Sequence, residues 1–441
     1  MTSSTSLGMI AIDDLRVGMF VHLDMGWWAH PFPLGNFKIT NVDQIATMRS
    51  LGLLSVRWSP SESDLPGSSL LDATVPPGVH GVHPGAGTGM PRPTPAESPA
   101  LTARARRKRE LASQRAALNL CERQFGEAAM DCRHVCSLVQ NRPQDARVQA
   151  EQLSRALVDK MLGNHDLCIR LLGEAAGDKA SMHAINVAVL SLLMGRTFGL
   201  PESDMLDLGV GAMLHDIGKI DLPDRVRHRA DNFSAPELRH YEEHVAHGVV
   251  HGRRMGLSNG ALLVIAQHHE QADGSGFPLK LGVDDLPVAS RIVALVNRYD
   301  NLCNPNMTSK ALTPHDALAL LFAQGRNKFD ASILGAFIRM MGVYPAGSTV
   351  QLTDDRYALV VGVNSSRPLK PRVLVHELGV PREEALLLDL EASVGIGIRR
   401  SLRREQLPDA ALGYLSPHPR ASYFFEAAEL ADDEAAATAV A

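Results

Sequence analysis

A series of histidines in the middle of the chain constrains the fold more than any other feature. The series is His183, His215-Asp216, His244 and His268-His269, and roughly 25 to 30 residues separate successive members. Each member lies in or at the end of a segment with helical apolar spacing, and this separation is about the length of one helical hairpin. Successive helices of a bundle can therefore direct these side chains toward one point.

The residue types in this series are those that bind metal ions. Imidazole and carboxylate together suit Fe, Mn, Zn or Ni, and the series holds enough ligands for two ions. Neighbours on a helix diverge by about 100°, so His215 and Asp216 reach one cluster only near its rim, where Asp216 is free to bridge two ions. A single histidine is more often a hydrogen-bonded surface or core residue, and we assign His240, His247 and His251 to a polar helix face.

Two short motifs raise the series above coincidence. The first histidine-aspartate pair lies in LHDIGK, and the last histidine pair lies in HHEQADGSGFP. In the second motif the pair ends a helix and runs into a glycine-rich loop, whose backbone can approach a ligand closely. A random helical protein would rarely carry both motifs.

Composition divides the chain into five segments. Residues 1–65 carry the strand-like and helical runs of a small α+β module, and residues 66–100, rich in Gly, Pro and Ser, predict a disordered linker. Residues 101–345 have mainly helical spacing. Residues 346–425 carry short β-rich runs and predict a C-terminal β-module, and residues 426–441 form an acidic, alanine-rich tail. The expected fold class is mainly α, with two small modules that contain strands.

Charge and hydropathy exclude several classes of function. The net charge of −5 argues against binding to nucleic acid, because phosphate neutralisation needs a basic face. No run of about 18 uncharged apolar residues predicts a membrane span, and the N-terminus lacks the pattern of a signal peptide. We therefore expect a cytoplasmic protein without membrane association, and its five cysteines fit reduced thiols.

The two motifs, GAMLHDIGK followed by HHEQADGSGFP, resemble those of the HD-GYP subgroup of the HD metal-dependent phosphohydrolases. These are bacterial, all-helical phosphodiesterases that hydrolyse cyclic di-GMP. The resemblance covers roughly residues 175–341 and implies an HD-type helical bundle core. The opening run IDDLRVGMFVHL also resembles an N-terminal domain often attached to them. The implied activity is metal-dependent hydrolysis of cyclic di-GMP to linear pGpG and onward to GMP, in bacterial second-messenger signalling.

The resemblance also implies a site with two divalent metal ions, of which iron or manganese are favoured. One ion would take His183, His215 and Asp216, and the other would take Asp216, His244, His268 and His269. Asp216 and Lys219 are the implied catalytic residues, since Lys219 would stabilise negative charge on the phosphorane or leaving oxygen. The implied substrate-binding residues are Lys219, Gly274 of the loop 273–277, and Lys310.

Several positions depart from the family pattern. Asn297 stands where the family has a metal-binding aspartate, with Asp300 one turn away as a substitute. Lys179 replaces the glutamate of members that bind a third metal, and Asn306 and Ser309 replace arginines that hold the substrate phosphates. These departures keep open a degenerate sensor or interaction module that binds metal or diguanylate cyclase partners without turnover. Hydrolysis of another cyclic dinucleotide or phosphoester and assembly as a homo-oligomer also stay open.

Overall fold

The structure is a computed structural model, and most of the chain is described by it. The described residues are 8–23, 36–50, 53–64, 99–162, 167–173, 178–228, 232–307, 310–364, 369–393, 395–417 and 420–427. The predicted linker, apart from its last two residues, and most of the predicted tail therefore lie outside the described residues. The chain divides into two units, Met1–Arg109 and Glu110–Ala441, and each is described by itself.

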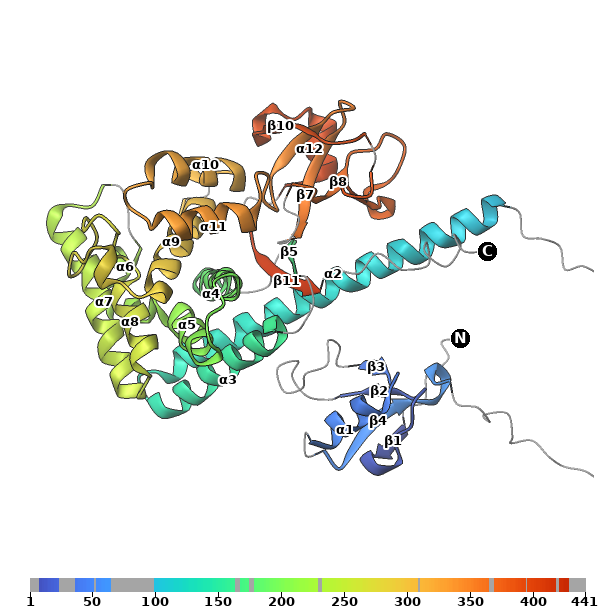
Figure 1. Ribbon diagram of the computed structural model, residues 1–441, viewed down its shortest axis with the longest axis horizontal. Coiled ribbons are helices and arrows are strands. Elements are labelled where there is room, and N and C mark those ends of the chain that lie inside the picture. The colour runs from blue at the N-terminus through green and yellow to red at the C-terminus, as the bar shows by residue number, and fades with distance from the viewer. Residues whose placement is uncertain are drawn as a thin grey trace, which may run out of the picture. The chain divides into compact units, whose positions relative to one another are not determined.

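The first unit contains a four-stranded antiparallel sheet, and a helix packs against it (Figure 1). The strands lie in the order β1 (Gly8–Ala11), β4 (Ser55–Ser59), β2 (Phe20–His22) and β3 (Asn36–Lys38), and the helix is α1 (Val42–Ser50). Ile45 and Met48 of the helix share a buried core with Val21 and Val56 of the sheet. The apolar side chains of the helix and of the sheet thus bury one another in a small core.

The second unit is mainly helical, as the sequence predicts. Its helices are α2 (Pro99–Leu138, which begins in the first unit), α3 (Pro143–Leu162), α4 (Lys179–Thr197), α5 (Glu202–Leu214), α6 (Asp224–Arg227), α7 (Ala235–Met255), α8 (Asn259–Gln267), α9 (Val288–Cys303), α10 (Pro314–Gln324), α11 (Ala331–Met341) and α12 (Asp409–Leu415). Helix α4 lies at the centre, with α5, α9 and α11 packed around it (Figure 1). It is buried on nearly every side from Ala184 to Gly195, as its long apolar run requires.

Side chains at the helix ends satisfy backbone groups that would otherwise lack partners. The carboxylate of Asp178 accepts hydrogen bonds from the amides of Ala180 and Ser181 at the start of α4. Ser234 and Glu237 form a reciprocal capping box at the start of α7, which ends at Gly256 with a positive φ of 76°. Among the described residues, no helix has both the length and the apolar character that spanning a bilayer requires.

A second antiparallel sheet packs against the helices. Its strands are β5 (Leu167–Leu171), β6 (Thr349–Leu352), β7 (Tyr357–Asn364), β8 (Arg372–Val375), β9 (Leu387–Asp389), β10 (Ile398–Leu402) and β11 (Tyr423–Ala427). The order is β10-β6-β7-β5-β11, with β8 paired to β7 and β9 paired to β8. Strand β11 contacts the central helix α4, so this sheet reaches the middle of the helical core (Figure 1).

This sheet combines parts of the chain that the sequence assigns to different segments. β5 comes from the region expected to be helical, and β11 includes Glu426, which the sequence places in the tail. Arg170 of β5 donates a hydrogen bond to the Glu426 carboxylate at 2.8 Å, and both side chains are largely buried. A short, fully buried apolar run such as β5 cannot be told from a piece of buried helix by periodicity alone.

Candidate metal centre

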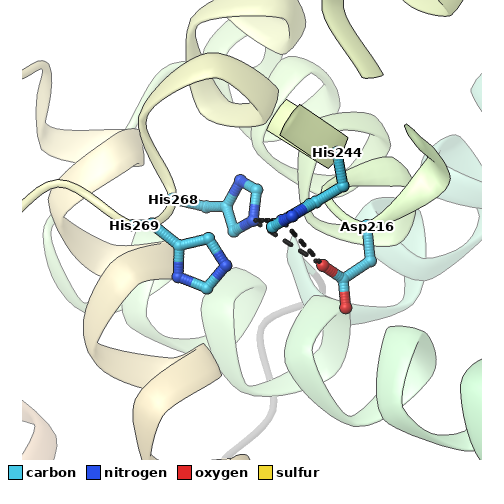
Figure 2. Close-up of side chains that lie close together, drawn as sticks. All are labelled: Asp216, His244, His268 and His269. Carbon is cyan, nitrogen blue, oxygen red and sulfur yellow. Dashed lines mark hydrogen bonds and ion pairs between the residues drawn. The ribbon is translucent and has the colours of Figure 1, made fainter. Parts of the chain in front are cut away.

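Four helices and one short 3-10 helix, η3 (Ile217–Asp221), converge on the predicted cluster. His183 lies in the first turns of α4 and His244 lies in the middle of α7. His215 and His268 occupy the positions directly after α5 and α8, and Asp216 precedes η3. Figure 2 shows Asp216 with three of the histidines around it. The structure thus brings together the residues that the sequence analysis grouped by spacing.

The histidine rings are oriented by hydrogen bonds at Nδ1. Nδ1 of His215, His244 and His268 lies 2.7, 2.5 and 2.8 Å from the carbonyl oxygen three residues earlier in each case. Nδ1 of His183 instead lies 2.5 Å from a carboxylate oxygen of Asp300. A ring that donates its Nδ1 proton keeps a lone pair on Nε2, which is the arrangement that metal-binding histidines adopt.

Asp216 stands between two pairs of rings, and each of its oxygens faces one pair. Its Oδ2 lies 3.8 Å from Nε2 of His183 and 3.5 Å from Nε2 of His215. Its Oδ1 lies 3.6 Å from Nε2 of His244 and 3.7 Å from Nε2 of His268 (Figure 2). One carboxylate is therefore placed to serve two adjacent ligand sets.

The glycine of the LHDIGK motif allows this placement. A Cβ atom at Gly218 would overlap the carbonyl oxygen of His244 and the amide of Gly248, so only glycine lets η3 lie directly against α7. The contact sets the distance between Asp216, two residues before this glycine, and His244 on the facing helix. The motif thus supplies two candidate ligands and also the close approach that positions one of them.

Burial and nearby charges shift the pKa values of the clustered histidines and of Asp216 in the directions that favour binding of a cation. Burial lowers the pKa of His244 to about 3 and that of His268 to about 4, and it lowers the pKa of His269 well below its ordinary value. Burial opposes the ionised form of Asp216, but Lys219 and the nearby histidines outweigh it and hold the pKa of this carboxyl well below 3.8. At neutral pH the Asp216 carboxylate is therefore anionic, and the three imidazoles of His244, His268 and His269 are neutral.

Unpartnered buried atoms show that the cluster fits a metal ion. Oδ1 of Asp216 and Nε2 of His269 are buried and have no hydrogen-bond partner among the described residues. Nε2 of His183 lies 3.2 Å from Nε2 of His215, and Nε2 of His244 lies 3.3 Å from Nε2 of His268. Where both Nδ1 atoms of a pair carry protons, these Nε2 lone pairs face one another, which is unfavourable unless a cation lies between them. Two groups meet the geometric requirement, one with His183, His215 and Asp216, the other with Asp216, His244, His268 and His269.

A polar network connects His183 to the C-terminal strand. Asp300 Oδ1 accepts hydrogen bonds from the amide groups of Asn186 and Asn304, at 2.9 and 2.8 Å. The same two amides donate to the carbonyl oxygen of Ala421, at 3.0 and 2.8 Å, and the Ala421 amide donates to Asn304 Oδ1 at 2.9 Å. Asp300 therefore acts behind His183, holding its ring, and is not part of either ligand group.

The predicted catalytic lysine, the predicted substrate-binding residues and Asn297 lie in different surroundings. Lys219 donates to Asp216 Oδ2 at 2.5 Å, and its Nζ lies 5.4 Å from the centre of the Tyr241 ring. Gly274 adopts a positive φ of 72° in the glycine-rich loop, and Lys310 is exposed. Asn297 is buried, and its Oδ1 accepts a hydrogen bond from Asn301 at 2.6 Å.

Two of the departures can be compared with the structure. Asn306 is exposed and accepts a hydrogen bond from Lys179, whereas Ser309 lies outside the described residues.

His240 and His247 are partly exposed on α7, as expected for a polar face. The assignment of His251 to that face is wrong, because its ring is buried and its Nε2 lies 2.7 Å from Asp221 Oδ2. The partner comes from η3, which the sequence did not place against α7.

Two residues of the second motif support the site without being candidate ligands. Glu270 is buried and accepts hydrogen bonds from the amides of Leu279 and Leu281, which folds the glycine-rich loop back on itself. The Phe277 ring stacks on His269, with 4.5 Å between ring centres, and closes one side of the cluster. Glu270 directly follows the histidine pair in the sequence. A carboxylate that is buried at this position needs hydrogen-bond donors nearby, and the loop amides supply them.

Lowering the pH should destabilise the metal-free protein. Since the folded-state pKa values of His244 and His268 lie at about 3 and 4, against an ordinary 6.5, the unfolded chain takes up protons that the fold excludes. Stability is then fully present above pH 6.5 and falls below it, by about 2 kcal/mol per histidine at pH 5. Asp216 does not offset this loss, because its low pKa keeps it ionised across this range in both states.

Urea unfolding of chelator-treated protein at pH 7.5 and pH 5 measures this effect. His244→Gln removes one of the buried imidazoles and should reduce the difference between the two pH values. An unfolding free energy that is equal at both pH values would show that these rings are not buried neutral.

Comparisons with known proteins agree with this geometry. Residues 156–333 match the family model described as HD domain, and residues 8–150 match one described as Domain of unknown function (DUF3391). The chain is 26% identical over 390 residues to cyclic di-GMP phosphodiesterase PA4108 of Pseudomonas aeruginosa, which covers 84% of this chain and 85% of that protein.

Two further relatives match over a shorter part of the chain. The 3'3'-cGAMP-specific phosphodiesterase 2 of Vibrio cholerae is 29% identical over 163 residues, which are 36% of this chain and 31% of that protein. The response regulator RpfG of Xanthomonas campestris, a cyclic di-GMP phosphodiesterase, is 31% identical over 149 residues, 33% of this chain and 39% of that protein. The HD-domain match over residues 156–333, the two motifs and the clustered histidines together make this chain similar to HD-domain phosphodiesterases.

Proposed function

We propose that this protein is a metal-dependent phosphodiesterase that hydrolyses cyclic di-GMP to linear pGpG and onward to GMP. The observation that carries the proposal is Asp216, whose two oxygens each face a separate pair of histidine Nε2 atoms. The relative that matches over most of both chains is named for the same activity. Because a relative is named as a phosphodiesterase specific for 3'3'-cGAMP, this dinucleotide is the second substrate to test beside cyclic di-GMP.

In this proposal the first ion is held by His183, His215 and Asp216, and the second by Asp216, His244, His268 and His269. When bound, two divalent ions, iron or manganese by preference, supply Lewis-acid chemistry that polarises phosphodiester oxygens and lowers the pKa of water. The protein's own side chains would bind and orient the ions and stabilise the charge on the phosphate.

Lys219 is the cation next to the reacting phosphate in this proposal. Burial lowers its pKa, but Asp216 and Tyr241 outweigh that effect and keep the pKa above its ordinary value, so the ammonium stays charged. A fixed positive charge at this point would stabilise the negative charge that develops on the phosphate or leaving oxygen. The Nδ1 partners of the histidines hold the rings in place, so that no reorientation is needed during the reaction.

The experiment that tests the function combines two measurements on one preparation. Protein purified without oxygen would be analysed for metal content and assayed for turnover of cyclic di-GMP and 3'3'-cGAMP. We expect up to two ions per chain and hydrolysis of cyclic di-GMP. Metal-loaded protein that hydrolyses neither dinucleotide would contradict the proposal.

A second candidate function rests on Asn297. A neutral amide is a weaker ligand than a carboxylate, and in this buried position its oxygen already accepts a hydrogen bond from Asn301. A protein whose first metal position is weak could instead act as a sensor or interaction module, binding metal or diguanylate cyclase partners without turnover. The two candidates differ in what a restored carboxylate would do.

Asn297→Asp should raise the occupancy of the first metal position toward one ion, because it adds a carboxylate with almost no change in volume. If hydrolysis is the native function, turnover at limiting metal should rise as well; the sensor candidate expects metal content to rise without turnover. Metal analysis and urea unfolding would be measured together. A loss of about 2 kcal/mol or more of stability with unchanged metal content would mean that the new charge is buried away from the ions.

A further inference from the structure

A small cavity lies beside His183. It is lined by Lys179, His183, Asn186, Asp300, Asn304 and Arg420, with Met182, Ala421 and Ser422. Its volume is about 20 Å³, room for about one water molecule, so a larger ligand would bind at its mouth. Lys179 and Arg420 are partly exposed, whereas Asn186 and Asp300 are buried, so the two cations lie at the outer side.

Among the described residues, no carboxylate forms an ion pair with either of these two cations. The hydrogen-bond partner of Lys179 is the neutral amide oxygen of Asn306. Burial lowers the pKa of Lys179 to about 8, and the charges of Arg420 and Lys219 lower it further, although the Asp300 carboxylate acts in the opposite direction. Like charges held together in this way repel one another, and an anion placed between them would relieve the repulsion.

Both cations are held in fixed relation to His183. Lys179 lies four residues before His183 on α4, which places the two on one face of the helix, one turn apart. Arg420 directly precedes Ala421, whose amide and carbonyl are both bound by Asn304. Because Asn304 also holds Asp300, and Asp300 holds His183, the backbone at Arg420 is tied to the metal cluster.

We propose that Lys179 and Arg420 form an anion subsite that binds the second phosphodiester of a cyclic dinucleotide while the first lies at the metal cluster. This inference rests on the proposed function, since it takes the substrate class from it. A cyclic dinucleotide carries two phosphodiesters, each with one negative charge, and only one of them reacts at a time. Arg420 extends the substrate site to the C-terminal strand, far in sequence from both motifs.

The subsite predicts different effects on two substrates. Lys179→Gln and Arg420→Gln should each raise the KM for cyclic di-GMP about tenfold, the size expected when one charged hydrogen bond to phosphate is lost. The kcat/KM for bis(p-nitrophenyl) phosphate, which has one phosphodiester, should stay within about twofold of the unchanged protein. Arg420→Lys retains the charge and should recover most of the loss.

Two matched variants control for the loss of a positive charge. Lys370→Gln and Arg382→Gln remove exposed cations elsewhere in the same unit and should leave both substrates unaffected. Metal content and melting temperature of all variants should match the unchanged protein, which separates a subsite from a structural role. An unchanged KM for cyclic di-GMP, or an equal loss with both substrates, would overturn the subsite.

The same experiment separates failure of the subsite from failure of the proposed function. If the unchanged, metal-loaded protein hydrolyses bis(p-nitrophenyl) phosphate but not cyclic di-GMP, the proposed function fails. The subsite is then judged from the Kd for cyclic di-GMP measured by calorimetry. A tenfold weaker Kd in the two variants would support it, and an unchanged Kd or no binding to any form would overturn it.

Discussion

Replacing Asp216 with alanine should remove metal and phosphodiesterase activity together, with a fall in kcat/KM of about a thousandfold or more. The reason is that each oxygen of this carboxylate faces a different pair of histidine Nε2 atoms, so one substitution takes a ligand from both groups. It also leaves the Lys219 ammonium without its carboxylate partner, so that two positive ions and a lysine would repel one another.

The fold should survive this substitution. Asp216 lies in the short connection between α5 and η3, and its side chain supports no helix cap. Metal analysis, circular dichroism and turnover of cyclic di-GMP would be compared with those of Asp284→Ala, which removes an exposed carboxylate from the same unit. Activity that persists in metal-depleted Asp216→Ala protein would rule out a mechanism with two ions at this carboxylate.

A chain that ends at Pro417 should fail to fold its helical unit. The truncation removes β11, in which Tyr423, Phe424 and Phe425 are all buried. Burying each ring contributes about 2 to 3 kcal/mol, and together these contributions approach the whole net stability of an ordinary domain. It also removes the Ala421 carbonyl, which leaves donors of Asn186 and Asn304 unsatisfied behind His183.

The matched control is a chain that ends at Ala427. It retains β11 and the ion pair between Arg170 and Glu426, so it should bind metal and unfold like the full chain. Cooperative urea unfolding, monitored by circular dichroism, distinguishes the two truncations. A Pro417 chain that unfolds cooperatively and binds metal would show that the sheet is a separable module, as the sequence alone suggests.

Sequence reasoning anticipated which side chains come together, because each candidate ligand belongs to a local signal. His215, Asp216 and the histidine pair 268–269 lie in short motifs, and the spacing of the others matches one helical hairpin. The mainly α fold follows from long amphipathic or fully apolar runs, and the β-rich runs after residue 345 lie where β6, β7 and β8 form.

What the sequence could not supply are contacts between distant residues. The partner that fixes His183 is Asp300, and the groups that fix Asp300 include Asn186, Asn304 and the backbone near residue 421. Each is an ordinary polar residue in its own surroundings, and its role depends on helix packing that no local pattern encodes. β5 was missed for the same reason, since its partner β11 lies more than 250 residues along the chain.

That separation has a consequence for how the protein is made. Arg170 and Glu426 are 256 positions apart, and a ribosome adds roughly 5 to 20 residues per second, so β5 waits roughly 10 to 50 seconds for its partner strand. During that time the Asn186 and Asn304 side chains also lack the Ala421 backbone that binds them in the finished protein. We expect the nascent helical region to need protection by chaperones until its last strand is made.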